Sequence, residues 1–486
     1  MIKFARFNTF SVVTILAFSV AVLEPFSSRA AEKDRVLRAG AYEINITPTR
    51  FPVSSNGSMR DRQATTAHDP LFARCLVLDN GITRIGLAVC DSCMIPRDVF
   101  DAAKERASAK TGIPVANMLM SATHTHTGVT VTGVFQSEPD EEYRTFLIDQ
   151  IAVGIETAWR QRTAAKIGWA SADDPSQVFN RRWHMKSDYR YSDPFGRGMD
   201  RVKMNPRRAD PALDRPSGPI DPEICLLSVR SLDGVPICVL ANYSLHYVGG
   251  VPSHLLSADY FGEFAGRFTQ RIDAESVFPS FIAIMSNGTS GNINNINFTA
   301  QGQRRLPFEQ IRLVALSVTD AAYRAYASIE YRDWIPLRAS ESEIELSVRV
   351  PSERDIEEAN ALLAAAGPGP YSDVKHIYAR ETTLLSEFPS TVRAKLQAFR
   401  IGELGIVSSP CETFVETGLA IKEQSPLEMT FTIELANGYN GYLPTPEHHE
   451  LGGYETWRAR SSYLAADAEP KIRAELLRLL EEVAQE

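Results

Sequence analysis

Two closely spaced histidines are the residues of this chain best suited to chemistry. His124 and His126 lie in the segment SATHTHTG, residues 121–128, directly after the apolar run Asn117–Ala122. On an extended chain, residues two apart face the same side, so both imidazoles are expected to point to one place. Imidazole is the commonest protein ligand for Zn²⁺. The spacing suits one metal, or one ligand beside a hydrogen-bond donor; two histidines with ordinary structural hydrogen bonds remain the alternative.

Three more polar residues follow predicted strands, at points where a loop begins. They are His246 after Val235–Ala241, Glu412 after Leu404–Val407 and Tyr442 after Met429–Leu435. Each has an ordinary structural explanation: a core histidine, a carboxylate at a helix N-terminus and an aromatic turn. Asp259 is expected either to orient the imidazole of His246 or to cap the helix that starts near Tyr260.

A turn rich in glycine and asparagine, residues 287–295, follows the predicted strand Ser280–Ser286. Such residues favour left-handed backbone positions. Ser290 stands between two glycines, but the spacing is one residue short of a G-x-S-x-G nucleophile elbow. The turn is predicted to be a tight structural loop or a loop pressed against substrate.

The elements that must position these residues alternate between strand and helix patterns. Ile85–Cys90 is a further predicted strand, and the helices are predicted at Asp98–Thr111, Glu141–Arg162, Gln310–Ile329, Ser352–Ala366 and Asp467–Ala484. This alternation predicts an α/β fold with a mixed α+β core. The aperiodic stretch Trp183–Pro219 is predicted to be a long surface loop, which in compact domains is often a functional lid.

The bulk composition is that of a globular protein. The 486 residues are 44% apolar and 23% charged, with a net charge of −9 and no basic stripe, so nucleic-acid binding is not expected. The six cysteines are assigned no chemistry. The sequence does not indicate an oligomeric state.

Residues 1–30 are predicted to be a signal peptide. Lys3 and Arg6 precede the apolar stretch Phe10–Val22, which is too short to span a bilayer comfortably, and small residues flank Arg29. An uncleaved membrane anchor is the alternative. The prediction is therefore an exported protein, periplasmic or secreted.

In their order along the chain, these segments resemble the neutral ceramidase family from about Ala39 onward. The resemblance rests on AYEINITP at 41–48, HDPLFAR at 68–74 and, most specifically, SATHTHTG at 121–128. It implies one large catalytic domain over residues 31–486, with mixed sheets and flanking helices. The chain is expected to depart from the family in having no C-terminal immunoglobulin-like domain after its closing helix. The resemblance also implies one Zn²⁺ held by His124, His246, Glu412 and Tyr442.

The resemblance further implies catalytic roles around the substrate carbonyl for His126, Arg181 and Tyr454. Asn294 stands where the family carries a serine proposed to act in catalysis. Because an amide cannot replace a serine nucleophile, water activated by zinc is the expected nucleophile, with no residue assigned as general base.

Three functions are consistent with these residues. The first is a zinc-dependent hydrolase that cleaves the amide bond of ceramide or a related N-acyl lipid, a small-molecule substrate that could bring peripheral membrane contact. The second is a zinc-dependent esterase or deacylase for an acylated sugar or another polar acyl substrate. The third is a non-catalytic metal- or carbohydrate-binding protein.

Overall fold

The computed structural model describes residues 1–3, 5, 8 and 35–485. The predicted signal peptide over residues 1–30 lies almost entirely outside the described residues. Residues from Val36 onward form one unit. No helix in the described part of the chain combines the length and the hydropathy that crossing a bilayer requires.

An eight-stranded mixed sheet carries most of the N-terminal half of this unit. Its strand order is β16-β14-β13-β8-β1-β5-β6-β7. The bounds are β1 Arg38–Asn45, β5 Phe72–Asp79, β6 Arg84–Cys90, β7 Met118–Ala122, β8 Thr163–Asp173, β13 Glu223–Ser231, β14 Pro236–Tyr243 and β16 Ile282–Asn287. The β6–β7 and β14–β16 pairs are parallel.

A second sheet of four strands has the order β18-β19-β20-β22. Its strands are β18 Leu337–Ser347, β19 Thr391–Ile401, β20 Leu404–Ser408 and β22 Met429–Ile433. The β20–β22 pair is parallel, so both strands end at the same edge. Two short parallel strands, β21 Glu412–Thr413 and β23 Tyr442–Leu443, follow at that edge and pair Glu412 with Tyr442.

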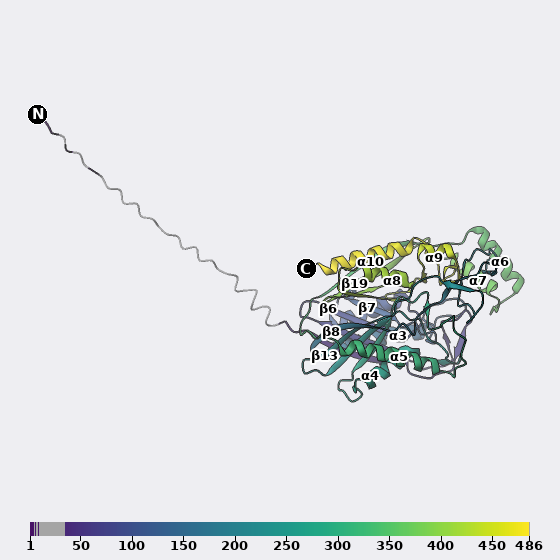
Figure 1. Cartoon of the computed structure of the whole chain (residues 1–486), viewed down its shortest axis with the longest axis horizontal. Helices are drawn as coiled ribbons and strands as arrows, with labels where there is room; N and C mark the ends of the chain where they lie inside the picture. Colours follow the sequence, from purple (N-terminus) through teal and green to yellow (C-terminus); the bar gives the residue numbers. More distant parts are fainter. Residues whose placement is uncertain (4, 6–7, 9–34, 486) are drawn as a thin grey trace. The chain divides into compact units, whose positions relative to one another are not determined.

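The two sheets pack face to face and helices cover their outer faces. One face of the large sheet meets α2 Arg97–Thr111 and α3 Glu141–Arg160, and further along it meets α4 Asp259–Arg271 and α5 Glu309–Ala327. The small sheet is covered by α8 Val415–Gln424 and α10 Ala468–Ala484. Figure 1 shows α4 and α5 on one side of the strands and α8 and α10 on the other.

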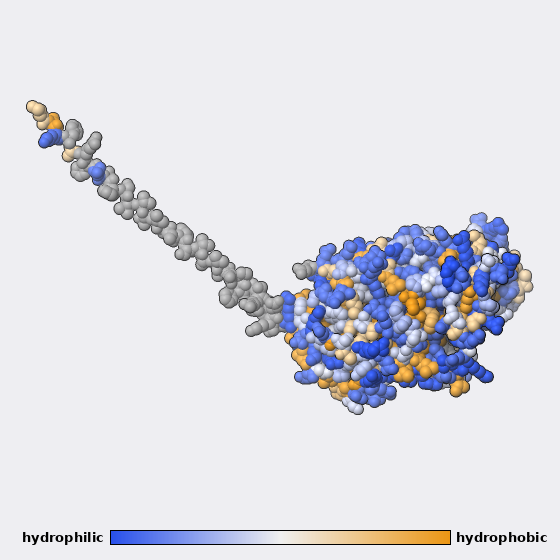
Figure 2. Space-filling model, in the orientation of Figure 1, coloured by the Kyte–Doolittle hydropathy of each residue, from blue (hydrophilic) through white to orange (hydrophobic). Residues whose placement is uncertain are grey.

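Alternating side chains divide the core between these layers. Cys75 and Val77 point toward α2 and α3, whereas Leu76 and Leu78 pack against Phe399, Phe431 and their neighbours in the small sheet. This period of two is what a strand buried on both faces requires. On the face of the molecule that Figure 2 shows, hydrophobic residues are scattered among hydrophilic ones, as is usual for a globular protein.

The edges of the large sheet approach each other, and the end of β22 joins them. The N–H of Glu434 donates to the carbonyl of Asn287, at the end of β16, at 3.1 Å, and the N–H of Ala122, the last residue of β7, donates to the carbonyl of Leu435 at 3.1 Å. Asn437 donates its N–H to Met120 at 2.8 Å. Loops that leave β7, β14, β16, β20 and β22 are thereby gathered at one place.

Most predicted elements are confirmed, with bounds shifted by a few residues. Gly112 ends α2 in the left-handed conformation, and Ser352 with Asp355 forms a capping box at α6 Glu353–Ala366. Helix α7 Val374–Leu385 follows, and α9 Pro446–Leu451 lies between β23 and α10.

The prediction of a structureless loop over Trp183–Pro219 is wrong. The segment contributes to a three-stranded sheet of β10 Arg182–Met185, β11 Val202–Met204 and β12 Leu213–Pro216. These strands are too short to show a period in the sequence. The remaining short pairs are β2 Val53–Ser55 with β3 Arg62–Ala64, β4 Thr66–Ala67 with β15 Leu255–Leu256, and β9 Phe179–Asn180 with β17 Ile293–Asn294.

We expect Asn437→Ala to lower the free energy of unfolding by about 3 kcal/mol, because buried partners lose their hydrogen bonds and φ is positive at this residue. Its side chain bonds Lys104 at 2.6 Å, Gln397 at 2.8 Å and Ser408 at 3.1 Å, and its φ is 63°. Urea unfolding measures the change. Asn360→Ala, on the exposed face of α6, is the matched control and should stay within about 0.5 kcal/mol of wild type.

Candidate metal centre

His124 and His126 reach one place by a route that differs from the predicted one. The strand ends at Ala122, and His124 has a φ of 71°, so the two histidines do not alternate on an extended chain. Their Nε2 atoms nevertheless lie 3.1 Å apart. The left-handed residue turns the chain so that His124 points inward, with 1% of its surface exposed.

His246 joins them from the end of β14. Its Nε2 lies 3.1 Å from Nε2 of His124. The carboxylate of Glu412 completes the cluster, since its Oε2 lies 3.2 Å from Nε2 of His124 and 4.0 Å from Nε2 of His246. His124, His246 and Glu412 are all buried, and their ligand atoms are close enough to share one ion.

Hydrogen bonds on the far side of each ring fix which nitrogen carries the hydrogen. Nδ1 faces a backbone carbonyl in all three histidines: Cys93 at 2.8 Å for His124, Gly57 at 3.0 Å for His126 and Ser290 at 3.2 Å for His246. A carbonyl oxygen only accepts, so Nδ1 must donate. In the neutral rings, each Nε2 therefore presents a lone pair to the same small space.

Glu412 Oε2 has no hydrogen-bond partner although it is buried. A buried carboxylate oxygen left unpaired is costly. With all three rings neutral, the imidazole lone pairs and this oxygen repel one another, and either a metal ion between them or a proton on His124 removes the repulsion. This donor set, nitrogen and oxygen with each imidazole held from behind, fits Zn²⁺.

The same electrostatics separates the pKa values of the three imidazoles. Complete burial lowers the pKa of His124, but the neighbouring Glu412 carboxylate raises it, and the net pKa lies well above the ordinary value. Burial, reinforced by the charge of His124, holds the pKa values of His126 and His246 well below the ordinary value. His126 and His246 are therefore neutral, as metal ligands or proton acceptors must be.

Ser290 and Glu434 support His246 from behind. The Oγ of Ser290 lies 3.2 Å from Nδ1 of His246 and donates to Glu434 at 2.7 Å. Glu434 also accepts from Asn287 at 2.9 Å and from the N–H of Thr413 at 2.7 Å. Burial raises the pKa of Glu434 to about 8 against the hydrogen bonds from Ser290 and Thr413; a nearby cation would favour its charged form.

The loop at 287–295 presses on the cluster itself. A Cβ on Gly291 would lie 2.5 Å from the carbonyl oxygen of Glu412, and no real Cβ approaches that closely. Gly57 packs in the same way against His126. Both glycines let the backbone come close enough to fix the positions of the site residues.

A cavity of about 220 Å³ opens beside His124, His126 and Glu412. Arg181, Tyr442 and Tyr454 also line it, so the structure gathers these three predicted residues at the same cavity. The guanidinium of Arg181 donates to Tyr442 Oη at 3.1 Å and to the carbonyl of Gly291 at 2.7 Å, and pairs with buried Glu455 at 3.0 Å.

Asn294 is set back from the cavity. Its amide donates to the side chain of Asn205 at 2.7 Å, and it is Asn205 that lines the cavity. Asn294 therefore influences the cavity only by holding the side chain of Asn205 in place.

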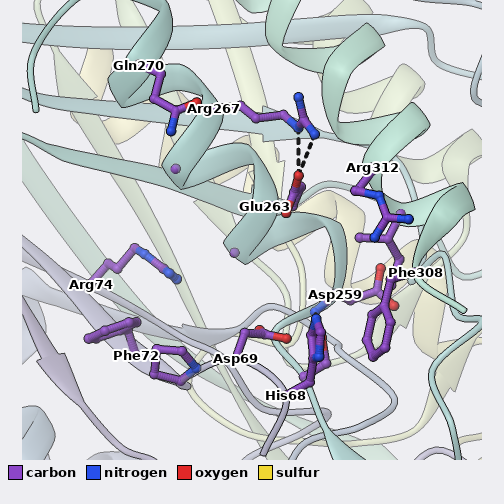
Figure 3. Close-up of a pocket in the computed structure, with 15 residues that line it drawn as sticks. His68, Asp69, Phe72, Arg74, Asp259, Glu263, Arg267, Gln270, Phe308 and Arg312 are labelled. Carbon is purple, nitrogen blue, oxygen red and sulfur yellow. Dashed lines mark hydrogen bonds and ion pairs between the residues drawn. The ribbon is translucent and has the colours of Figure 1, made fainter.

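Asp259 does not orient His246. Its carboxylate accepts the N–H groups of Val248 at 3.0 Å, Gly249 at 2.8 Å and Tyr260 at 2.6 Å, which fixes the loop after His246 and the start of α4. It faces a separate cavity of about 300 Å³, where the His68 ring stacks on Phe308 and Arg267 pairs with Glu263 (Figure 3). The HDPLFAR segment thus lines this second cavity, away from the metal ligands.

Three residues around the cluster were not predicted from the sequence: Tyr247 and Tyr439, which line the cavity, and buried Cys93 behind His124. Tyr247 stacks on His126 with ring centroids 3.6 Å apart, Tyr439 donates to Glu412 Oε1 at 3.1 Å, and Cys93 lies with its Sγ 3.7 Å from Nδ1 of His124. All three neighbour predicted elements, and Tyr439 lies within the turn that was singled out for Tyr442. The sequence alone does not say which of two nearby tyrosines faces inward.

Comparison with known proteins identifies the fold. Neutral ceramidase from Pseudomonas aeruginosa matches with a TM-score of 0.70 and 19% identity, over 93% of this chain and 74% of that chain. A ceramidase complexed with C2 matches with the same score and identity, over 93% and 75%. No protein-family model matches the sequence, and no curated protein does. The chain has the α/β fold of the neutral ceramidases, as the resemblance predicted.

We expect Gly291→Ala to lower the affinity for Zn²⁺ by at least about 10-fold, because the added methyl displaces Glu412, and such displacements of supporting groups cost 10- to 100-fold. Competition with a zinc-binding dye measures the affinity. Gly266→Ala, where a Cβ meets nothing within 4 Å, should bind Zn²⁺ as the wild type does. Equal affinities in the two variants would contradict this account of Gly291.

Proposed function

We propose that this chain is a zinc-dependent hydrolase that cleaves the amide bond of an N-acyl compound, ceramide or a related N-acyl lipid being the first candidate. The observation that carries the proposal is the convergence of buried lone pairs from His124, His246 and Glu412 beside a substrate-sized opening. The fold shared with ceramidases supports the reaction class. Tyr442, paired with Glu412 across β21 and β23, is the proposed fourth ligand.

Bound Zn²⁺ supplies a water whose pKa falls from 15.7 toward about 7 and a positive charge beside the acyl oxygen. The residues around it have separate tasks. His126 is neutral and its Nε2 lone pair is free of hydrogen, so this ring accepts a proton from the attacking water. The hydrogen bond from Nδ1 of His126 to Gly57 supports this acceptor role, in place of the role as a donor to the substrate carbonyl that the resemblance suggested.

Tyr454 and Arg181 are the donors toward the charge that develops on the acyl oxygen. Burial raises the pKa of Tyr454, so its phenol stays protonated and able to donate. Arg181 remains charged, because Tyr442 and Glu455 raise its pKa against the effect of burial. The proton accepted by His126 is then available for the departing amine, as hydrolysis requires.

We expect His124→Ala to lose bound Zn²⁺ and at least about 10³-fold in kcat, since removing a ligand removes the activated water. Metal content by mass spectrometry and hydrolysis of an N-acyl substrate measure the two effects. Removing the metal from wild type with a chelator should stop hydrolysis, and Zn²⁺ should restore it. Because the pKa of His124 is raised, Zn²⁺ must displace a proton, and affinity should fall as the pH is lowered.

His254→Ala is the matched control, since His254 is exposed and only its backbone carbonyl is bonded. It should keep the zinc content and rate of wild type. A chelated protein that hydrolyses at the full rate would refute the proposal.

We expect Tyr454→Phe to lower kcat by about 10²-fold with unchanged zinc content, because one donor to the developing oxyanion is lost. The control is Tyr323→Phe on α5, far from both the cluster and its cavity in the fold. An unchanged kcat for Tyr454→Phe, measured on protein with full zinc content, would remove Tyr454 from the mechanism.

A further inference from the structure

A third cavity, of about 360 Å³, lies beside the metal-centre cavity. The two share Met59, Met204 and Tyr454 in their walls, so Tyr454 lies between them. The outer cavity is formed by the 191–204 segment, the start of α7 and the turn at 453–457. Because the two cavities are adjacent, a substrate whose acyl carbon lies at the metal centre can extend one of its ends toward this outer cavity.

The outer cavity is lined by charged side chains of both signs. Asp193, Asp200 and Asp373 contribute carboxylates, and Lys203 and Lys375 contribute ammonium groups. Within residues 35–485, neither lysine makes a side-chain hydrogen bond or ion pair. Hydrogen-bond donors and acceptors thus face one space whose charges nearly cancel.

Two of these carboxylates are held in place by neighbouring groups. Asp200 accepts from the N–H of Gly453 at 2.8 Å and from Nε1 of Trp457 at 3.0 Å. Asp193 accepts the N–H groups of Phe195 at 2.8 Å and Arg197 at 3.2 Å. The acceptors are thus fixed by the fold before a substrate arrives, which lowers the cost of binding.

Aromatic rings complete the walls. Tyr454 and Trp457 pack edge to face with ring centroids 5.9 Å apart. Tyr191 donates its hydroxyl to the carbonyl of Arg201 at 2.8 Å, so its ring position is fixed too. Aromatic faces beside fixed polar groups suit a ligand with one apolar face and a polar rim.

The charged groups that line the outer cavity are a poor match for a hydrocarbon chain, although apolar and aromatic side chains form the larger part of its walls. Ligand sites for apolar molecules are lined mainly by apolar side chains with few polar groups, and covering charged groups with hydrocarbon would remove their water without compensation. The inner cavity also has apolar side chains in its wall, Met94, Val134 and Phe135, and none of its lining residues is a lysine. We place the acyl group against these side chains, and the polar part of the substrate beside the charged groups of the outer cavity.

We propose that the outer cavity binds an uncharged polyhydroxylated head group, such as the ring of an N-acylated amino sugar, as the amine side of the scissile amide. This inference rests on the proposed function. Hydroxyl groups both donate and accept, which matches mixed carboxylates and ammonium groups better than an ion of either sign does. Water adds its oxygen to the acyl carbon, the C–N bond breaks, and the nitrogen leaves with a proton as the free amino sugar.

The test compares two amines on the zinc-loaded full chain by ligand-observed NMR and calorimetry: glucosamine, and sphingosine below its aggregation concentration. The pH is kept above the pKa of the glucosamine amine, so that the sugar is uncharged as the proposal requires. Glucosamine should bind in the millimolar range or tighter and more strongly than sphingosine. In the double variant Lys203→Met/Lys375→Met, the affinity for glucosamine should fall at least about 5-fold, because two hydrogen-bond donors are lost. Lys110→Met, an exposed lysine at the end of α2, should bind as wild type does.

A second experiment measures hydrolysis of two substrates that carry the same acyl chain, one on the nitrogen of glucosamine and one on the nitrogen of sphingosine. A higher kcat/KM for the sugar, reduced through KM in the double lysine variant, supports the inference. Tighter binding and faster hydrolysis of the sphingosine compounds would overturn it while leaving the hydrolase proposal intact. Specific glucosamine binding without turnover of any N-acyl substrate would overturn the proposed function and leave the subsite.

Discussion

The site depends on three backbone carbonyls that accept hydrogen bonds from the far side of three imidazoles. With Nδ1 of His124, His126 and His246 committed to Cys93, Gly57 and Ser290, each neutral ring turns a bare Nε2 toward the others. The unpaired Oε2 of Glu412 adds a further acceptor, so this buried space requires a positive charge, either a metal ion or the proton that Glu412 favours on His124. Such an arrangement is unfavourable without a cation and favourable with one.

The fold is what brings these groups to one point. His124 and His246 follow strands at or beside opposite edges of the eight-stranded sheet, and would lie far apart if that sheet were flat. The end of β22 hydrogen-bonds to both edges, through Asn287 and through the β7 segment. The chain after β20 and β22 then supplies Glu412, Tyr439 and Tyr442, paired through two short strands. The packing of two sheets thus determines the geometry of the centre.

The sequence predicted much of this and missed what depends on contacts. Long helices such as α2 and α3 were predictable because their apolar positions follow the helical period, and polar residues at strand ends marked the cluster. The sequence could not show that His124 adopts a positive φ, that His126 presents an acceptor, or that Asp259 holds a loop instead of an imidazole. The acceptor on His126 depends on Gly57, which is distant along the chain, and the other two depend on backbone geometry that residue types do not specify. The three-stranded sheet of β10, β11 and β12 was missed because its strands are too short to show a period in the sequence.

The most direct test of the central claim is X-ray absorption at the zinc K-edge of the wild-type protein loaded with one equivalent of Zn²⁺. The account predicts a first shell of nitrogen and oxygen alone at about 2.0–2.2 Å, with the multiple scattering that imidazole rings give. A sulfur scatterer at about 2.3 Å would place the ion on Cys93 and contradict the proposed ligand set. A spectrum of hydrated zinc, with no protein ligands, would contradict the metal centre itself.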